Sequence, residues 1–161
     1  LQGLAHEHPT GVYKLRLLLR ADGQPHAEAA PLPAPAEGPR TVQLASAPLP
    51  RADVDEFVRH KTTQRQAYAP FAPTAGVFDT LLHNARGELT EFTIGNVALK
   101  LDGQWFTPPL HCGLLPGVMR EALLAEGRLQ ERVLTLADLP RAEGLALVNS
   151  VRGWVDVVLA A

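Results

Sequence analysis

Phe92-Thr93-Ile94-Gly95-Asn96-Val97-Ala98-Leu99-Lys100-Leu101 is the stretch of sequence that decides the fold, and Asp102-Gly103 follows it directly. Apolar and β-branched residues dominate this run, which predicts a strand over residues 92–101. Asp-Gly is a preferred pair for a tight turn, so residues 104–106 (Gln-Trp-Phe) are expected to form the next strand. The centre of the chain is therefore predicted to be antiparallel sheet.

The segments on either side repeat this pattern. Strands are predicted where alternating or apolar runs end at turn residues, over residues 12–20, 41–47, 77–83, 133–139, 144–148 and 154–159. Asn84-Ala85-Arg86-Gly87 predicts a hairpin turn. Residues 62–69 are compatible with a helix, and residues 118–125 predict another, with Pro116 as its first residue and Gly127 as its stop. The sequence predicts an α+β fold of mostly antiparallel strands with few helices.

The composition excludes several classes of protein. With 46% hydrophobic residues among 161, the chain can bury a core. Fifteen Lys and Arg against 17 Asp and Glu leave a net charge of -2, which gives no electrostatic argument for binding nucleic acid or a membrane. The single cysteine, Cys112, cannot form an internal disulfide, and no apolar run is long enough to span a bilayer. No signal peptide heads the chain, so a cytoplasmic location is expected.

Lysine is rare in this chain. Twelve arginines stand against three lysines, Lys14, Lys61 and Lys100. Because lysine, unlike arginine, can lose its proton and act as an amine nucleophile, each of the three is a candidate. Lys61 lies between the cations Arg59 and Arg65, which would lower the pKa of its amine and favour the nucleophilic form. The alternative interpretation is a solvated basic loop.

Three further segments carry candidate binding residues. Glu91 is either a solvated charge at a strand edge or a carboxylate held against a pyridinium nitrogen. Residues 117–119 would present free backbone N–H groups at a helix start, which favours phosphate, although every helix has such an end. Asn149-Ser150 lies between two apolar strands and predicts a turn or a ligand-facing loop. His6 and His8 are interpreted as solvated, so no metal site is predicted.

The order of these segments is more informative than any one of them. In sequence they are Lys61, residues 90–96 with Glu91 and Asn96, Thr107-Pro108-Pro109-Leu110, residues 115–120 and Asn149-Ser150. Taken together they resemble the class IV aminotransferase family of fold-type IV pyridoxal-phosphate enzymes. Residues 78–153 are most similar to its aminodeoxychorismate lyase branch. The strings that resemble this branch specifically are His60-Lys61-Thr62-Thr63-Gln64-Arg65 and Asn149-Ser150-Val151-Arg152-Gly153, and the family resemblance runs from about Gly11 to the C-terminus. The resemblance implies the larger, pseudo-barrel-like domain of the D-amino acid aminotransferase-like fold.

The resemblance also implies roles for individual residues. The residues that match cofactor-binding positions of the family are Lys61, Glu91, Val118, Met119 and Ser150. Lys61 matches the lysine that carries pyridoxal 5'-phosphate covalently and moves protons, and Glu91 matches the acid at the pyridine nitrogen. Val118 and Met119 match backbone phosphate donors, and Ser150 matches a phosphate-binding hydroxyl. Asn96 matches a recurrent asparagine without an assigned cofactor contact. Branched-chain transaminases carry a tyrosine where this chain has Gln66, which favours the lyase.

Proteins of this family begin with a smaller domain that supplies a phosphate-binding arginine and much of the substrate pocket. Residues 1–10 are therefore interpreted as the end of such a domain or a linker, and residues 11–161 as the cofactor-binding large domain, with a Pro/Ala-rich loop at 31–40. Because the chain begins with Leu1 rather than Met, it is expected to be a fragment or a processed product. Nothing in it matches the smaller domain, so it is not expected to be a competent enzyme by itself.

The reaction implied by the resemblance is conversion of 4-amino-4-deoxychorismate to 4-aminobenzoate and pyruvate in folate biosynthesis. The expected partners are a small-molecule substrate, a second copy of the chain in a homodimer, and a fused or associated aminobenzoate synthase component. One alternative is a class IV amino-acid aminotransferase that uses the same lysine. Another is a non-catalytic, truncated domain that acts by association.

Overall fold

A computed structural model of the chain describes residues 2–34, 37–50 and 56–160. The chain divides into two compact units, Leu1–Glu37 and Gly38–Ala161. The division falls after Glu37, and the interpretation of residues 1–10 as the end of a preceding domain stays a prediction. In the described part of the chain, no helix combines the length and the apolar character needed to cross a bilayer.

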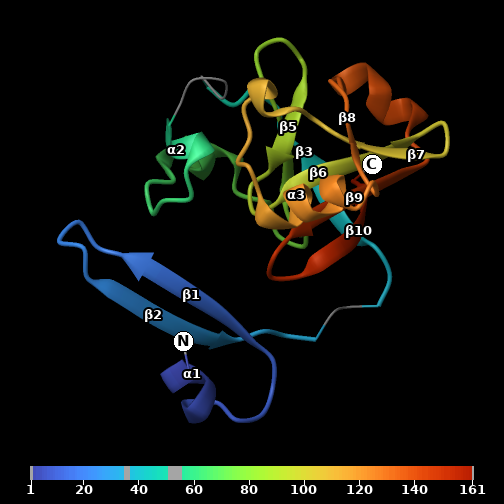
Figure 1. The fold of residues 1–161 in the computed structure, drawn as a ribbon. Helices are drawn as coiled ribbons and strands as arrows, with labels where there is room; N and C mark the ends of the chain where they lie inside the picture. The colour runs from blue at the N-terminus through green and yellow to red at the C-terminus, as the bar shows by residue number, and fades with distance from the viewer. Residues whose placement is uncertain (1, 35–36, 51–55, 161) are drawn as a thin grey trace. The chain divides into compact units, whose positions relative to one another are not determined.

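The N-terminal unit is a short helix followed by a hairpin (Figure 1). Helix α1 spans Gln2–Glu7, and strands β1 (Tyr13–Leu19) and β2 (Pro25–Pro31) pair antiparallel. Strand β1 confirms the prediction for residues 12–20, whereas β2 was not predicted, because its alanines and prolines carry a weak strand signal. Pro31 ends β2 rather than beginning a loop, and residues 35 and 36 lie outside the described residues.

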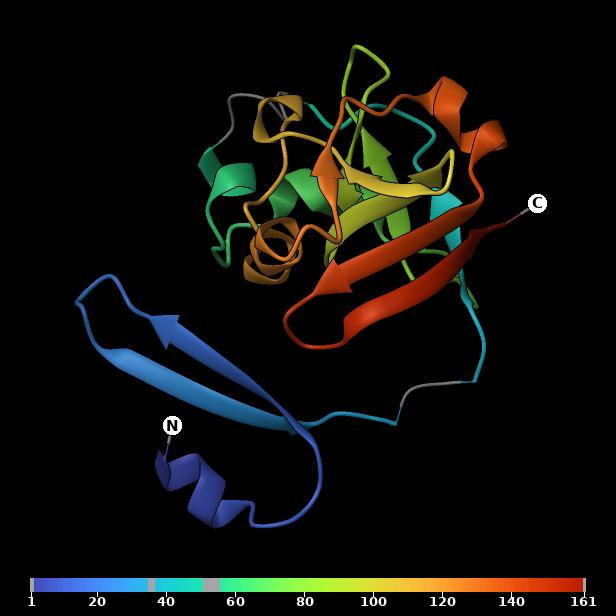
Figure 2. The same ribbon diagram turned by 45° about the vertical axis from the view of Figure 1, so that its right-hand side comes forward.

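The C-terminal unit is a sheet that closes on itself. Its strands are β3 (Arg40–Leu44), β4 (Thr80–His83), β5 (Leu89–Phe92), β6 (Asn96–Leu101), β7 (Gln104–Thr107), β8 (Gln130–Glu131), β9 (Gly144–Asn149) and β10 (Gly153–Leu159). They lie in the order β5-β4-β3-β10-β9-β6-β7-β8, and pairing of β5 with β6 closes the first six. Figure 2 shows the antiparallel β9–β10 hairpin on one side of this barrel. The predicted class, α+β with mostly antiparallel strands in a pseudo-barrel, is confirmed.

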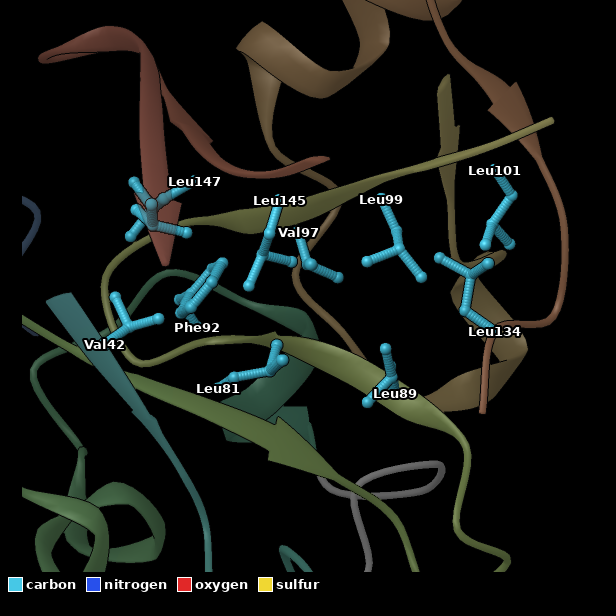
Figure 3. Packing of buried hydrophobic residues seen from close by; sticks show 11 residues of the cluster. Val42, Leu81, Leu89, Phe92, Val97, Leu99, Leu101, Leu134, Leu145 and Leu147 are labelled. Atoms are coloured by element: carbon cyan, nitrogen blue, oxygen red, sulfur yellow. The ribbon is translucent and has the colours of Figure 1, made fainter. Parts of the chain in front are cut away.

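The interior of the barrel is filled by alternate residues of its strands, because successive side chains of a strand point to opposite faces. Figure 3 shows Leu81, Leu89 and Phe92 from β4 and β5 facing Val97 and Leu99 from β6. The members of this cluster that are entirely shielded from solvent are Val42, Leu81, Leu89, Phe92, Val97, Leu99, Leu134 and Leu147. The strands that carry the candidate residues therefore have a rigid, apolar base.

The helices of this unit are few and short. Helix α2 spans Glu56–Arg59 and α3 spans Val118–Ala125, and three 3-10 helices are η1 (Gln66–Phe71), η2 (Leu110–Cys112) and η3 (Leu136–Arg141). Helix α3 packs on the outer face of β6 and β9, where Leu123 meets Ala98, Ala146 and Val148. This contact places the start of α3 beside the barrel.

Two of the sequence predictions are wrong because side-chain hydrogen bonds outweigh the local preference for a strand. Residues 92–101 form the end of β5, a turn at 93–95 (the β5–β6 turn) and β6, instead of one strand. The Asp79 carboxylate accepts hydrogen bonds from the Thr93 hydroxyl at 2.5 Å and the Ile94 N–H at 3.1 Å, which stabilises the turn. Residues 133–139 are not a strand, because Thr135 and Asp138 form a capping box that begins η3.

Two helix boundaries also differ from the prediction. The helical segment near residues 62–69 is the 3-10 helix η1, and it includes Pro70 instead of stopping before it. Pro116 precedes helix α3, whose N-cap is Gly117, so the helix starts two residues later than expected. Gly127 has a φ of 71° just past the end of α3, which agrees with its predicted role as a stop.

Candidate functional site

The carboxylate of Glu91 is buried and accepts hydrogen bonds from two donors. Glu91 lies on β5, and only 3% of its surface is exposed. Its Oε1 accepts a hydrogen bond from the Tyr68 hydroxyl at 2.6 Å, and its Oε2 accepts one from the Leu115 N–H at 3.1 Å. Glu91 is therefore not the solvated edge charge that was the alternative interpretation.

The pKa of Glu91 is raised to about 7, mainly because burial removes water from the charged form. The hydrogen bonds from Tyr68 and Leu115 lower it, as do the positive charges of Arg65 and Lys61. These opposing effects leave the carboxyl able to change its charge near neutral pH. A group tuned in this way is a candidate for a binding or catalytic site.

Lys61 lies between α2 and η1 with its side chain exposed. The positive charge of Lys61 lowers the pKa of Glu91, although 30 residues separate the two in the sequence. The segment that carries Lys61 is held on both sides by a small buried cluster (Ala45, Leu49, Val58, Tyr68, Phe71 and Leu82), which we name the Tyr68 cluster. The side chain of Arg59, the other cation expected beside Lys61, lies outside the described residues.

Arg65 ties the Lys61 segment to the β5–β6 turn. Its Nη2 donates a hydrogen bond to the carbonyl oxygen of Thr93. Its guanidinium carbon lies 4.4 Å from the centre of the Tyr68 ring, which is a cation–π distance. The turn that follows Glu91 and the segment that carries Lys61 are thus held together by one side chain.

The start of α3 is held at the same turn by Asn96. The Nδ2 of Asn96 donates to the carbonyl oxygen of Leu115 at 2.8 Å, and its Oδ1 lies against the Cα of Gly117. Among the described residues no side chain caps the helix, and the first amide with a helical partner is that of Glu121, bonded to the Gly117 carbonyl at 3.0 Å. The Val118 and Met119 amides are therefore at the free N-terminal end, where an anion is favoured.

Ser150 lies in the exposed turn between β9 and β10. Asn149, the residue before it, shapes this turn by accepting hydrogen bonds from the Val151 and Arg152 N–H groups at 3.0 and 2.8 Å. The Nδ2 of Asn149 also donates to the carbonyl oxygen of Ile94 at 3.0 Å. The turn that carries Ser150 is thereby attached to the β5–β6 turn.

Segments that carry predicted site residues are therefore attached at the β5–β6 turn or beside it. Four polar side chains fasten other segments to this turn or to its flanks: Arg65, Asp79, Asn96 and Asn149. Sequence reasoning missed Tyr68 and Asp79 and treated Arg65 only as a neighbouring charge. A tyrosine in an otherwise polar run, and an aspartate between apolar residues, were the available signals.

Gly117 is required by the close approach of Asn96. A Cβ on Gly117 would collide with Asn96 Oδ1, although its φ of -75° suits any residue. We expect Gly117→Ala to destabilise the C-terminal unit by about 1–3 kcal/mol, since the helix start must shift. Urea unfolding followed by the fluorescence of Trp105 and Trp154 would measure this. Gly3→Ala, where nothing lies within 4 Å, is the matched control, and equal midpoints for the two variants would contradict the prediction.

Comparison with known proteins relates this arrangement to one family. The family model of amino-transferase class IV matches residues 2–160. A Schizosaccharomyces pombe protein assigned as an aminodeoxychorismate lyase is 46% identical over 77 residues, which is 46% of this chain and 33% of that protein. The curated relatives are matched over about a third of their length, between 31% and 40%.

Solved structures share the fold. A protein from Mesorhizobium loti, assigned as an amino-acid aminotransferase, is 38% identical with a TM-score of 0.83, over 92% of this chain and 73% of that one. An aminotransferase from Brucella abortus, solved with bound pyridoxal phosphate, is 20% identical with a TM-score of 0.72, over 87% of this chain and 53% of that one. The second likeness concerns the fold alone.

Proposed function

We propose that this chain, which belongs to the class IV aminotransferase family, is the pyridoxal-phosphate-binding part of an aminodeoxychorismate lyase. The observation that carries the proposal is the buried carboxyl of Glu91. It accepts hydrogen bonds from two donors, and the positive charge of Lys61 lowers its pKa. The lyase branch is supported by the 46% identity with the Schizosaccharomyces pombe protein. An aminotransferase is the second candidate, because the Mesorhizobium loti protein is 38% identical.

The donor set fits this cofactor. Glu91 offers a carboxylate that could accept a hydrogen bond from a protonated pyridine nitrogen, and Lys61 offers an amine for the aldehyde. The free amides of Val118 and Met119 and the hydroxyl of Ser150 suit a phosphate. Gly117 leaves the helix start without a side chain of its own. When bound, pyridoxal phosphate supplies an aromatic ring that withdraws electron density from the substrate carbon.

Each residue then has a distinct task in the lyase reaction. Lys61 would hold the cofactor through its amine and would remove a proton from the substrate ring. Loss of that proton and cleavage of the bond to the enolpyruvyl oxygen leave an aromatic product, and a proton added to the enolpyruvyl carbon completes pyruvate. Glu91 would hold the pyridine nitrogen of the cofactor in its protonated form. Because a cationic partner favours the charged carboxylate, binding should lower the pKa of Glu91 from about 7.

The test of this function separates the two candidates. Given 4-amino-4-deoxychorismate and pyridoxal phosphate, we expect equal amounts of 4-aminobenzoate and pyruvate, with no need for a 2-oxo acid. The 4-aminobenzoate formed by this chain is measured by fluorescence, and the pyruvate is measured by coupled oxidation of NADH. Amino transfer that requires a 2-oxo acid, without release of 4-aminobenzoate, would identify the aminotransferase instead.

The surroundings of the reaction are part of the same proposal. A homodimer, association with an aminobenzoate synthase component and a cytoplasmic location would fit the lyase. The pocket should be completed by a further domain, since the described site residues all come from one unit. This chain alone is then expected to form product slowly.

A further inference from the structure

Tyr68 joins the segment that carries Lys61 to the strand that carries Glu91. Its hydroxyl donates to Glu91 Oε1 at 2.6 Å, across 23 residues of sequence. Tyr68 is 8% exposed and belongs to the Tyr68 cluster, which also contains Val58, three residues before Lys61. We infer that Tyr68 is a positioning residue, which fixes the Glu91 carboxyl so that it can hold the pyridine nitrogen of the cofactor. This inference rests on the proposed function.

The geometry supports this because two donors fix the carboxyl from two sides. Tyr68 holds Oε1, and the Leu115 N–H holds Oε2 at 3.1 Å. Together they define the rotation of the carboxyl group about its terminal bond. An ionised carboxylate has about four lone-pair sites, so each oxygen keeps capacity for a further donor. The Tyr68 side chain is suited to this task because its ring is already packed, so holding the carboxyl costs little additional conformational entropy.

Arg65 holds the Tyr68 ring on one of its faces. The guanidinium lies over the Tyr68 ring, and its hydrogen bond to the Thr93 carbonyl keeps it there. A cation held over the ring adds a cation–π contact, which fixes the orientation of the phenol whose hydroxyl donates to Glu91. The charged groups that act on Glu91 are Arg65 and Lys61, and both favour the ionised carboxylate.

A simpler interpretation is that Tyr68 only fills space and satisfies its own hydroxyl. The two interpretations differ in what Tyr68→Phe should change, because that variant keeps the ring and removes only the hydroxyl. A space-filling role predicts a small loss of stability and no effect on the cofactor. A positioning role predicts an effect on the cofactor that exists only while Glu91 is present.

The experiment therefore combines a titration with a double-mutant cycle. Glu91 is titrated by carbon-13 NMR in the cofactor-free chain, its resonance being the one lost in Glu91→Gln. The Kd of pyridoxal 5'-phosphate is measured by fluorescence for the unmodified chain, Tyr68→Phe, Glu91→Gln and the double variant. Tyr13→Phe is the matched control, because Tyr13 stacks on His8 in the N-terminal unit. Urea unfolding establishes that each variant is folded.

In Tyr68→Phe we expect the pKa of Glu91 to rise from about 7 by roughly one unit or more, since a hydrogen bond to its charged form is lost. The Kd should rise about tenfold, and by less than about twofold when Glu91→Gln is already present. Tyr13→Phe should change neither quantity.

An unchanged Glu91 titration in a folded Tyr68→Phe chain would overturn the inference. So would an equal loss of affinity with and without Glu91. If the unmodified chain binds no pyridoxal phosphate, the proposed function is contradicted, and so is the role of Tyr68 in cofactor binding. The titration needs no cofactor, so it still decides whether Tyr68 controls the carboxyl.

Discussion

Replacing Lys61 with alanine should abolish covalent attachment of pyridoxal phosphate and lower product formation by at least about a thousandfold, the scale expected when a covalent catalyst is removed. The fold should be preserved, because Lys61 lies exposed between α2 and η1 and surface substitutions change stability by about 0.5 kcal/mol or less. Loss of the cofactor without loss of the fold would identify a chemical role for this amine.

Reductive trapping makes this prediction specific to one lysine. Borohydride converts the bond between a lysine and the cofactor aldehyde into a stable amine, and peptide mass mapping then locates the adduct, which we expect on Lys61. Lys14→Ala and Lys100→Ala are the matched controls. Lys100 lies 3.7 Å from Glu143 in a surface ion pair, whose loss should cost about 1 kcal/mol or less. An adduct on either control lysine would refute the assignment.

The sheet could be predicted from the sequence wherever a strand carries its own signal. The β6–β7 hairpin is an example, because Asp102 and Gly103 adopt φ values of 51° and 76°, as the predicted tight turn requires. The β5–β6 turn could not be predicted, since it depends on the distant Asp79 carboxylate. Local patterns indicate strands and turns, whereas they do not reveal a buried polar contact that interrupts a run of strand formers.

The candidate site could be predicted only in part for a similar reason. Glu91 and the start of α3 stand out because each lies at the edge of a recognisable element, and Lys61 because lysine is rare here. Tyr68 and Asn149 act through contacts that cross 23 and 55 residues of sequence. Such pairings become visible only when the barrel has closed. The candidate residues are therefore easier to predict from the sequence than the side chains that hold their segments in place.

Glu91→Gln should retain covalent attachment at Lys61 and lose about two to three orders of magnitude in turnover. Glutamine carries no negative charge to balance a protonated ring nitrogen, so the cofactor ring withdraws electron density less strongly. The amine of Lys61, which forms the covalent bond, is unchanged. The expected loss of turnover is taken from the typical effect of removing one electrostatic group from an active site, which lowers the rate by about 10²–10³. Product formation is measured for Glu91→Gln and for the unmodified chain, and unchanged turnover would show that Glu91 has no role in the chemistry.

The same variant should also change how stability depends on pH, which tests the environment of Glu91 without any cofactor. Its pKa is raised from 4.5 to about 7 in the folded chain, so folding favours the neutral form. That contribution to stability is fully present below pH 4.5 and is lost as the pH rises through about 7. The unmodified chain should therefore lose on the order of 3 kcal/mol across this window relative to Glu91→Gln. Glutamine can keep both contacts by accepting from the Leu115 N–H and donating to the Tyr68 oxygen, so the difference reports the charge alone. Parallel pH profiles of the urea midpoints for the two proteins would mean that Glu91 is not shielded from water as the fold requires.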